Sequence, residues 1–245
     1  MSSSIPTFGI NEKAREYEGM ERQKKILVVG SGGHAKVVID TLERLRSCEI
    51  AGFVAPGRIG AEIYRGHRLI GHDEDLPKLF AQGIKTAVLG IGFMGRSNVR
   101  NRLFEQLSAI GYELPVLVDY AAVVSPDAVL GAGTYVGRQA VVNAEARIGR
   151  ACIINTGSIV EHECVVGDFT HVAVGAVLCG QVRIGSECLV GANSTVIQGL
   201  HIGDGCVLGA GTVVTKNVED HILIRNNIAV SMQIKRNIQK SGGNF

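Results

Sequence analysis

The sequence contains no tryptophan, and aromatic residues make up only 5% of its 245 residues. Five prolines are set against 32 glycines. So many small residues are unusual for an ordinary α/β domain, but they suit a backbone that turns at many closely spaced corners. The composition therefore favours a repetitive architecture over part of the chain.

The sequence also lacks an excess of basic or acidic residues. The 25 Lys and Arg residues against 23 Asp and Glu give a formal net charge of +2, which argues against nucleic acid as a partner. No apolar run approaches the roughly 18 residues that span a bilayer, so no membrane span is expected. Residues 1–22 lack the apolar core of a signal peptide. We expect a cytoplasmic protein with residues 1–22 as a mobile extension.

The next part of the chain, residues 23–119, alternates strand and helix patterns. The run KKILVV (24–29) leads into a glycine-rich turn and an amphipathic helix, and strand-like runs follow at 49–54 and 85–92. A further helix is predicted over 96–111. Strands that alternate with helices indicate a small parallel sheet, so this part is expected to form a Rossmann-like α/β domain.

The pattern changes at about residue 120 to a repeat of six residues. Sixteen consecutive positions from Val124 to Val214, taken every sixth residue, are all Ile, Leu or Val, and the residue four positions after each is mostly small or compact. Hexapeptide repeats are typical of a parallel β-helix, which we predict over residues 120–219. Four of the six cysteines occupy the compact position and are expected to pack there as small hydrophobes: Cys152, Cys164, Cys188 and Cys206.

If three hexads form one coil, residues eighteen apart stack on one another. His162, in the run Glu161-His162-Glu163, then lies one coil below Gly180, about 4.8 Å away in strand spacing. A histidine and a backbone N–H at this separation could serve as the base and the oxyanion donor for one reacting carbonyl. Two carboxylates within one strand could orient the histidine ring. The alternative is a solvated surface histidine.

A zinc site is the competing interpretation of His162 and His171, which are nine residues apart. The positions 36 residues earlier, Pro126 and Tyr135, supply no third histidine, so no metal is expected. The loop GSGGHA (30–35) fits G-x-G-x-x-A between a strand and a helix, which predicts phosphate binding by backbone N–H groups. An NAD site would also need an acidic residue at the end of the second strand. The sequence there is GFVAPG (52–57), which contains no acid and argues against NAD.

The two motifs VVGSGGHAKVV and INTGSIVEHECVVGDFTHVAVGAVLCGQVRIG resemble those of the bacterial nucleotide-sugar N-acetyltransferases, in the sialic-acid-O-acetyltransferase-like family of hexapeptide-repeat proteins. The resemblance covers about residues 24–219. It implies that the β-helix is left-handed, and that an acetyl group passes by direct attack from acetyl-CoA to a nucleotide-linked amino sugar of the 4-amino-4,6-dideoxy type.

By the same resemblance His162 is the general base, Glu163 supports it, and Gly180 offers its N–H to the thioester oxygen. A homotrimer is implied, with acetyl-CoA between neighbouring solenoids. The acetyl-CoA and acceptor cleft would be formed by His171, Gly191, Ala192, Gly209 and Ala210. The nucleotide-sugar loop would consist of Gly30, Ser31, Gly32, Gly33 and His34.

The sequence departs from this family in three places. The aspartates usually found near Val54 and Ala55 are missing, Asp119-Tyr120 replaces a frequent His-Pro, and residues 220–245 form an atypical C-terminal tail, expected as strand or helix against the last coil. Two other functions stay open: O-acetylation of a sugar such as sialic acid, and a non-catalytic trimeric solenoid that binds a nucleotide sugar.

Overall fold

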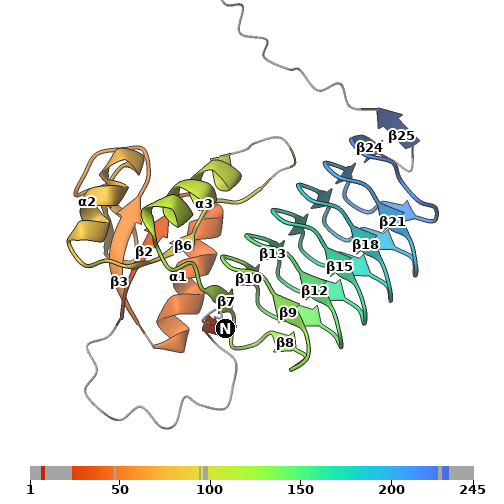
Figure 1. Cartoon of the computed structure of the whole chain (residues 1–245), viewed down its shortest axis with the longest axis horizontal. Coiled ribbons are helices and arrows are strands. Elements are labelled where there is room, and N and C mark those ends of the chain that lie inside the picture. The colour runs from red at the N-terminus through yellow and green to blue at the C-terminus, as the bar shows by residue number, and fades with distance from the viewer. Residues whose placement is uncertain are drawn as a thin grey trace, which may run out of the picture.

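The computed structural model describes residues 7–8, 24–46, 48–93, 95, 99–225 and 228–231. The extension expected over residues 1–22 lies outside the described residues apart from β1 (Thr7–Phe8), which pairs in parallel with β7 (Val116–Val118). The chain forms an α/β domain followed by a solenoid of stacked strands (Figure 1).

The N-terminal domain is built on a five-stranded sheet in the order β4-β5-β3-β2-β6, parallel except for the β4–β5 pair. Its elements are β2 (Lys24–Val29), α1 (Gly33–Leu45), β3 (Cys48–Val54), β4 (Glu62–Tyr64), β5 (His67–Gly71), η1 (Asp73–Asp75), α2 (Leu76–Ala81), β6 (Thr86–Leu89) and α3 (Val99–Ile110). The strands and helices predicted from the sequence are confirmed. The β4–β5 pair and α2 were not predicted.

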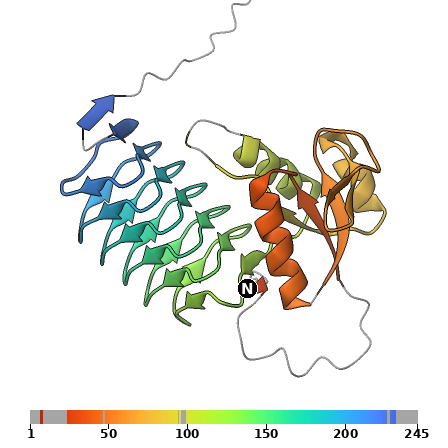
Figure 2. The same cartoon turned by 180° about the vertical axis from the view of Figure 1, so that it is seen from behind.

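Two apolar clusters hold the helices on opposite faces of this sheet. Ala35, Val38 and Ile39 of α1 pack with the strands on one face, and Leu76 of α2 and Leu103 of α3 pack on the other. The face covered by α1 is turned toward the solenoid (Figure 2), and α1 is therefore the main element between the sheet and the second domain.

The solenoid contains sixteen two-residue strands after β7, and the second residue of each is the aliphatic residue of one hexad. Strands eighteen residues apart pair in parallel, as Val160 does with Leu178, so the three-hexad coil is confirmed.

The strands form three faces. Face 1 continues β7 with β10 (Tyr135–Val136), β13 (Ile153–Ile154), β16 (His171–Val172), β19 (Leu189–Val190) and β22 (Val207–Leu208). Face 2 contains β8 (Val123–Val124), β11 (Val141–Val142), β14 (Ile159–Val160), β17 (Val177–Leu178), β20 (Thr195–Val196) and β23 (Val213–Val214). Face 3 contains β9 (Val129–Leu130), β12 (Arg147–Ile148), β15 (Val165–Val166), β18 (Arg183–Ile184) and β21 (His201–Ile202).

The interior of this triangular prism is a continuous apolar column. The second residues of the strands fill it together with compact residues such as Ala140 and Ala176. The cysteines predicted to pack there are buried free thiols, at positions 152, 164, 188 and 206. Among the described residues no helix is long and apolar enough to cross a membrane.

The N-terminal domain covers face 1. The outward residues Leu117, Tyr135 and Ile153, which stack at eighteen-residue spacing, belong to the same apolar cluster as α1. At the far end β24 (Ile222–Arg225) extends face 1, and β25 (Ile228–Ser231) pairs with it in antiparallel. The described part of the C-terminal tail is therefore strand, and the tail beyond residue 231 lies outside the described residues.

Candidate active site

The run Glu161-His162-Glu163 forms the corner between faces 2 and 3. It follows β14 directly and is a turn, not part of a strand as the sequence suggested. Glu163 adopts a left-handed backbone with φ 59°, as one residue does at nearly every corner of this solenoid. The two carboxylates therefore flank His162 on an exposed edge of the prism.

The ring of His162 is oriented by its neighbour. Its Nδ1 lies 3.1 Å from Glu163 Oε2, and the same oxygen accepts a hydrogen bond from Gln181 Nε2 at 3.1 Å. These bonds, that from His162 first, lower the pKa of the Glu163 carboxyl, which is therefore ionised at neutral pH. Since an ionised carboxylate can only accept, Nδ1 carries a proton, and the lone pair of a neutral ring is on Nε2.

Nε2 of His162 points at Gly180, as the stacking argument predicted. An ideal Cβ built on Gly180 would lie only 2.5 Å from this nitrogen. The N–H of Gly180 donates to no atom of the described residues, whereas Gln181 N–H binds His162 O at 2.9 Å. The corner thus presents a proton acceptor and a free backbone donor side by side.

His171 lies half a coil from His162, because nine residues are half of eighteen. It begins β16 on face 1 and is 8% exposed. Its Nδ1 donates to Phe93 O at 2.7 Å, and its Nε2 accepts from Asn155 Nδ2 at 3.0 Å. Burial lowers its pKa, so the ring is neutral and both nitrogens are occupied. Within this chain His171 holds the loop after β6 against the solenoid.

The glycine-rich loop lies at the N-terminal end of α1, at the carboxyl edge of β2. Gly30 has φ +109°, and a Cβ there would lie 2.5 Å from Ile91 Cγ1, so glycine is required. Ser31 is partly exposed, whereas Gly32 and Gly33 are exposed and an added Cβ on either would meet nothing within 4 Å. A ligand therefore has room to approach the first turn of α1, where the leading N–H groups of a helix lack intrahelical partners.

His34 belongs to the same loop but turns toward the solenoid. Its ring packs edge-on against Tyr135 at 5.2 Å, and its buried Nε2 has no hydrogen-bond partner among the described residues. Burial, Arg100 and His171, in that order, hold its pKa well below the usual value. His34 is therefore a neutral ring at the junction of the two domains.

Arg100 of α3 is a junction residue that sequence reasoning missed. It is 1% exposed and donates to backbone carbonyls of both domains, at 2.6 Å to Ile91 O and 2.8 Å to Ala151 O. Burial lowers its pKa to about 10, which still leaves it charged at neutral pH. Nothing in the amphipathic pattern of α3 marks this arginine, whereas Gln181 could have been found by stepping eighteen residues from Glu163.

The residues expected near acetyl-CoA lie on a third part of the prism. Gly191 and Ala192 follow β19, and Gly209 and Ala210 follow β22, at the corner between faces 1 and 2. A Cβ on Gly191 would lie 2.5 Å from Leu208 O, so close stacking of the coils alone accounts for this glycine.

One chain therefore does not bring the candidate residues together. His162, Glu163 and Gly180 lie at the corner opposite face 1, while the glycine loop, His34 and His171 lie on face 1. In a triangular prism these are opposite sides. Among the described residues no three His, Cys, Asp or Glu side chains gather into a possible metal site.

Comparisons with known proteins find a family match in each of the two domains. Residues 25–107 match the model of the PglD N-terminal domain, and residues 181–216 match the hexapeptide repeat of succinyl-transferase. The acetyltransferase domain of PglB from Neisseria gonorrhoeae has 31% sequence identity and a TM-score of 0.78, and the match covers 85% of this chain and 100% of that one. This chain belongs to the bacterial nucleotide-sugar acetyltransferases.

A second member of these nucleotide-sugar acetyltransferases is similar over nearly its whole length. PerB from Caulobacter crescentus, in complex with CoA and GDP-perosamine, has 32% identity and a TM-score of 0.76 over 85% of this chain and 97% of that one. An uncharacterised protein of Acanthamoeba polyphaga mimivirus is 30% identical over 124 residues, which are 51% of this chain. The chain spans only 23% of the length of that curated relative.

Proposed function

We propose that this protein transfers the acetyl group of acetyl-CoA to the amine of a nucleotide-linked amino sugar, of the 4-amino-4,6-dideoxy type, with His162 as general base. The observation that carries this proposal is the corner at which His162 Nε2 faces Gly180 while Nδ1 is held by Glu163. The similarity to PerB, whose structure contains CoA and GDP-perosamine, supports the same substrate class.

The proposed reaction is a direct transfer. The sugar amine attacks the thioester carbonyl and forms a C–N bond, while His162 Nε2 takes a proton from the amine. The oxygen of the tetrahedral intermediate is stabilised by the N–H of Gly180. As the C–S bond breaks, the imidazolium returns its proton to the CoA thiolate. Glu163 keeps the ring oriented and stabilises its transient positive charge.

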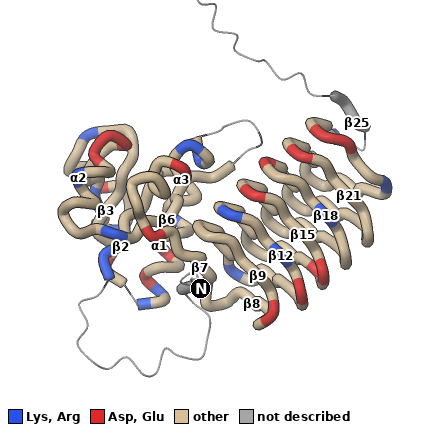
Figure 3. The backbone as a smooth tube through the Cα atoms, in the orientation of Figure 1, with Lys and Arg blue, Asp and Glu red and all other residues tan. Residues whose placement is uncertain are grey.

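A homotrimer would complete this site. Face 2 carries an outward column of Val123, Val141, Ile159, Val177, Thr195 and Val213. Face 3 instead presents arginines on β12 and β18, which are blue in Figure 3. Val123 is 62% exposed, so an apolar strip lies on a face that the N-terminal domain does not cover.

Packing through face 2 explains why the candidates are scattered. This face ends at the His162 corner on one side and at the corner of Gly191 and Gly209 on the other. In a threefold assembly each chain would turn face 2 toward the symmetry axis. The His162 corner of one chain then approaches the corner of Gly191 and Gly209 of the next chain. Acetyl-CoA would then lie between two solenoids, in contact with Ala192, Ala210 and the partner's catalytic corner.

The glycine loop is the proposed diphosphate site. Open space over Gly32 and Gly33 and the free N–H groups of α1 support this assignment. Val54 and Ala55, where the family resemblance led us to expect aspartate, are buried and apolar, so the base must be recognised by other groups. Acetyl-CoA is a metabolite of the cell interior, which supports a cytoplasmic location. O-acetylation of a sugar is the second candidate, because the corner would also accept a proton from a hydroxyl.

The decisive experiment measures release of CoA thiol with GDP-perosamine and with UDP- and dTDP-linked amino sugars, against sialic acid as the hydroxyl acceptor. Turnover with an amino sugar is expected, and His162→Ala should lower kcat by roughly 10²–10⁴-fold. His201→Ala, an exposed histidine on face 3, is the control. Turnover with sialic acid alone would favour O-acetylation. A loss below tenfold in a folded His162→Ala protein would rule out the base assignment.

A further inference from the structure

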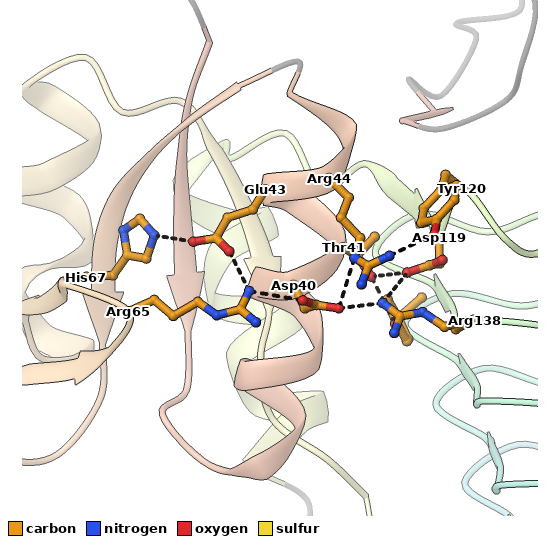
Figure 4. Close-up of polar contacts among 10 residues, drawn as sticks. Asp40, Thr41, Glu43, Arg44, Arg65, His67, Asp119, Tyr120 and Arg138 are labelled. Carbon is orange, nitrogen blue, oxygen red and sulfur yellow. Dashed lines mark hydrogen bonds and ion pairs between the residues drawn. The ribbon is translucent and has the colours of Figure 1, made fainter.

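A network of polar side chains joins the middle of α1 to the first coil of the solenoid, away from the candidate active site (Figure 4). Its members are Asp40 and Thr41 on α1, and Asp119, Tyr135 and Arg138 on the solenoid side. We call these five residues the α1 latch. None of them belongs to the proposed catalytic corner or to the glycine loop.

The ionic half of the latch joins Asp40 and Arg138. Arg138 Nη2 donates to Asp40 Oδ2 and lies 3.7 Å from Asp119 Oδ2. The hydrogen bond from Arg138 is the main reason why the pKa of Asp40 lies below its usual value. The side chains of Asp40 and Arg138 are 20% and 36% exposed, so this pair is partly shielded from water.

The buried half of the α1 latch centres on Asp119. Asp119 is 1% exposed, and its Oδ2 accepts from Thr41 Oγ1 at 2.7 Å. Its Oδ1 accepts from the N–H of Ala121 at 3.0 Å, which fixes the turn that begins the first coil. Since Thr41 donates to Asp119, its oxygen accepts from Tyr135 OH at 3.2 Å.

Helix α1 connects this latch to the glycine loop. Asp40 lies seven residues after Gly33, or about 10 Å along the helix axis. The apolar contact of α1 with Leu117 and Tyr135 favours burial of this helix face. It does not fix the orientation of α1 on the solenoid, because hydrophobic attraction is non-directional. The hydrogen bonds from Arg138 to Asp40 and from Thr41 to Asp119 are directional, so they can fix the orientation of α1 on the solenoid.

From this geometry we propose that Arg138 is a positioning residue. Its ion pair with Asp40 sets the orientation of α1 on the solenoid, and through α1 the position of residues 30–34, where the proposed function puts the nucleotide diphosphate. The inference rests on that proposed function for its consequence in catalysis. The effect on α1 itself does not depend on any substrate.

Two other polar contacts between the domains contribute less to the orientation of α1 on the solenoid. Arg44 donates to Tyr120 OH at 2.7 Å, but Tyr120 is 56% exposed, and exposed contacts of this kind contribute little. Arg100 is fully buried and joins the loop after β6, not α1, to the solenoid. Arg138 joins α1 to a corner of the solenoid through a partly shielded ion pair, and its side chain is exposed enough to be replaced without opening the core.

The chain offers a matched control for Arg138→Met. Arg65 also binds Asp40, at 3.0 Å from Asp40 Oδ1, but it belongs to the N-terminal domain. Arg65→Met removes one cation from the same carboxylate and leaves the contact between domains intact. Arg138→Lys keeps the charge at the junction and should restore part of the loss.

The first measurement is amide hydrogen exchange of residues 30–45 without ligand. Arg138→Met should exchange faster there than wild type, Arg65→Met should not, and Arg138→Lys should fall between. Equal exchange in Arg138→Met and wild type would overturn the proposal. If Arg138→Met does not fold, Asp40→Asn is compared with Arg65→Met, because it removes the partner of Arg138 as well as that of Arg65. Faster exchange in Asp40→Asn than in Arg65→Met would support the proposal, and equal exchange would overturn it.

The second measurement is kinetic and uses GDP-perosamine and acetyl-CoA. Arg138→Met should lower kcat/KM for the nucleotide sugar by roughly 10–100-fold, because a displacement of about 1 Å can have this effect. The KM for acetyl-CoA should stay unchanged. An equal loss for both substrates would indicate general damage and contradict a positioning role. Failure of wild type with every amino sugar would reject the proposed function, while the exchange result would still decide the role of Arg138.

Discussion

The ring of His162 occupies the space where a side chain on Gly180 would begin. Nε2 of the ring lies 2.5 Å from the ideal Cβ position, in contact with the next coil of the same solenoid. The backbone donor and the proposed base are therefore kept together by strand spacing, which is among the least variable distances in a protein.

This relationship predicts the effect of Gly180→Ala. The added methyl group must push the imidazole away, so kcat should fall by roughly 10²-fold or more while the fold is retained. Steady-state kinetics and circular dichroism make the measurement. Gly199→Asn is the control, because Cβ there meets nothing within 4 Å and asparagine tolerates its φ of +71°. Unchanged kcat in Gly180→Ala would contradict the proposed arrangement.

The buried histidines predict a loss of stability in weak acid. The pKa values of His34 and His171 are lowered in the folded chain, so below about pH 6.5 the unfolded chain binds more protons than the folded one. Their contribution is complete above that pH and is lost as the pH falls toward the lowered values. The free energy of unfolding measured in urea should therefore be lower at pH 5.5 than at pH 7.5.

His171→Gln should reduce this pH dependence, because glutamine does not titrate. His201→Gln, an exposed histidine on face 3, should leave it unchanged. The same slope in wild type and His171→Gln would show that the buried ring does not govern the acid response.

Arg100→Met should be among the more damaging substitutions in α3. It leaves the carbonyls of Ile91 and Ala151 without their donor at the domain junction, which is expected to lower the free energy of unfolding by about 2–4 kcal/mol. Arg102→Met, on the same helix, removes an exposed ion pair with Asp73 and should change stability by less than about 1 kcal/mol. Chemical unfolding of both variants tests this, and equal effects would show that burial of Arg100 has no special weight.

The face 2 column predicts which valine supports assembly. Val177→Lys puts a charge in the proposed interface and should convert the proposed trimer to monomers, with loss of turnover because the proposed site draws on two chains. Val165→Lys, the matching outward valine on face 3, should keep the trimer. Light scattering after size-exclusion chromatography measures both. Dissociation caused by Val165→Lys instead would move the interface to face 3.

The solenoid could be predicted almost strand by strand from the sequence, because each hexad repeats one local rule. An aliphatic residue must fill the column, and a compact residue must fit beside it. The burial of Ile154 and Ser158 could therefore be predicted from their places in the hexad. The stacking of His162 below Gly180 follows from the same rule, since the coil length fixes both. The hexad rule does not predict side-chain orientation, and the turn geometry of Glu161 to Glu163 came from the structure.

The junction of the domains could not be predicted in this way. Arg100, Asp119 and Arg138 are charged residues in ordinary amphipathic or corner positions, and their contacts depend on how the two domains meet. Long-range contacts of this kind leave no period in the sequence. The role of His171 was obscured for the same reason, because its partner Phe93 belongs to the other domain.

Pairing at eighteen-residue spacing also limits how this enzyme can change length. Removing or adding one residue inside a coil would turn every later aliphatic side chain out of the column, whereas adding a whole coil would leave all three faces in register. The height of the proposed catalytic corner above the first coil, where Asp119 and Arg138 contact α1, can therefore change only in steps of about 4.8 Å. A donor or acceptor of different length would have to be accommodated by whole coils or by loops at the corners.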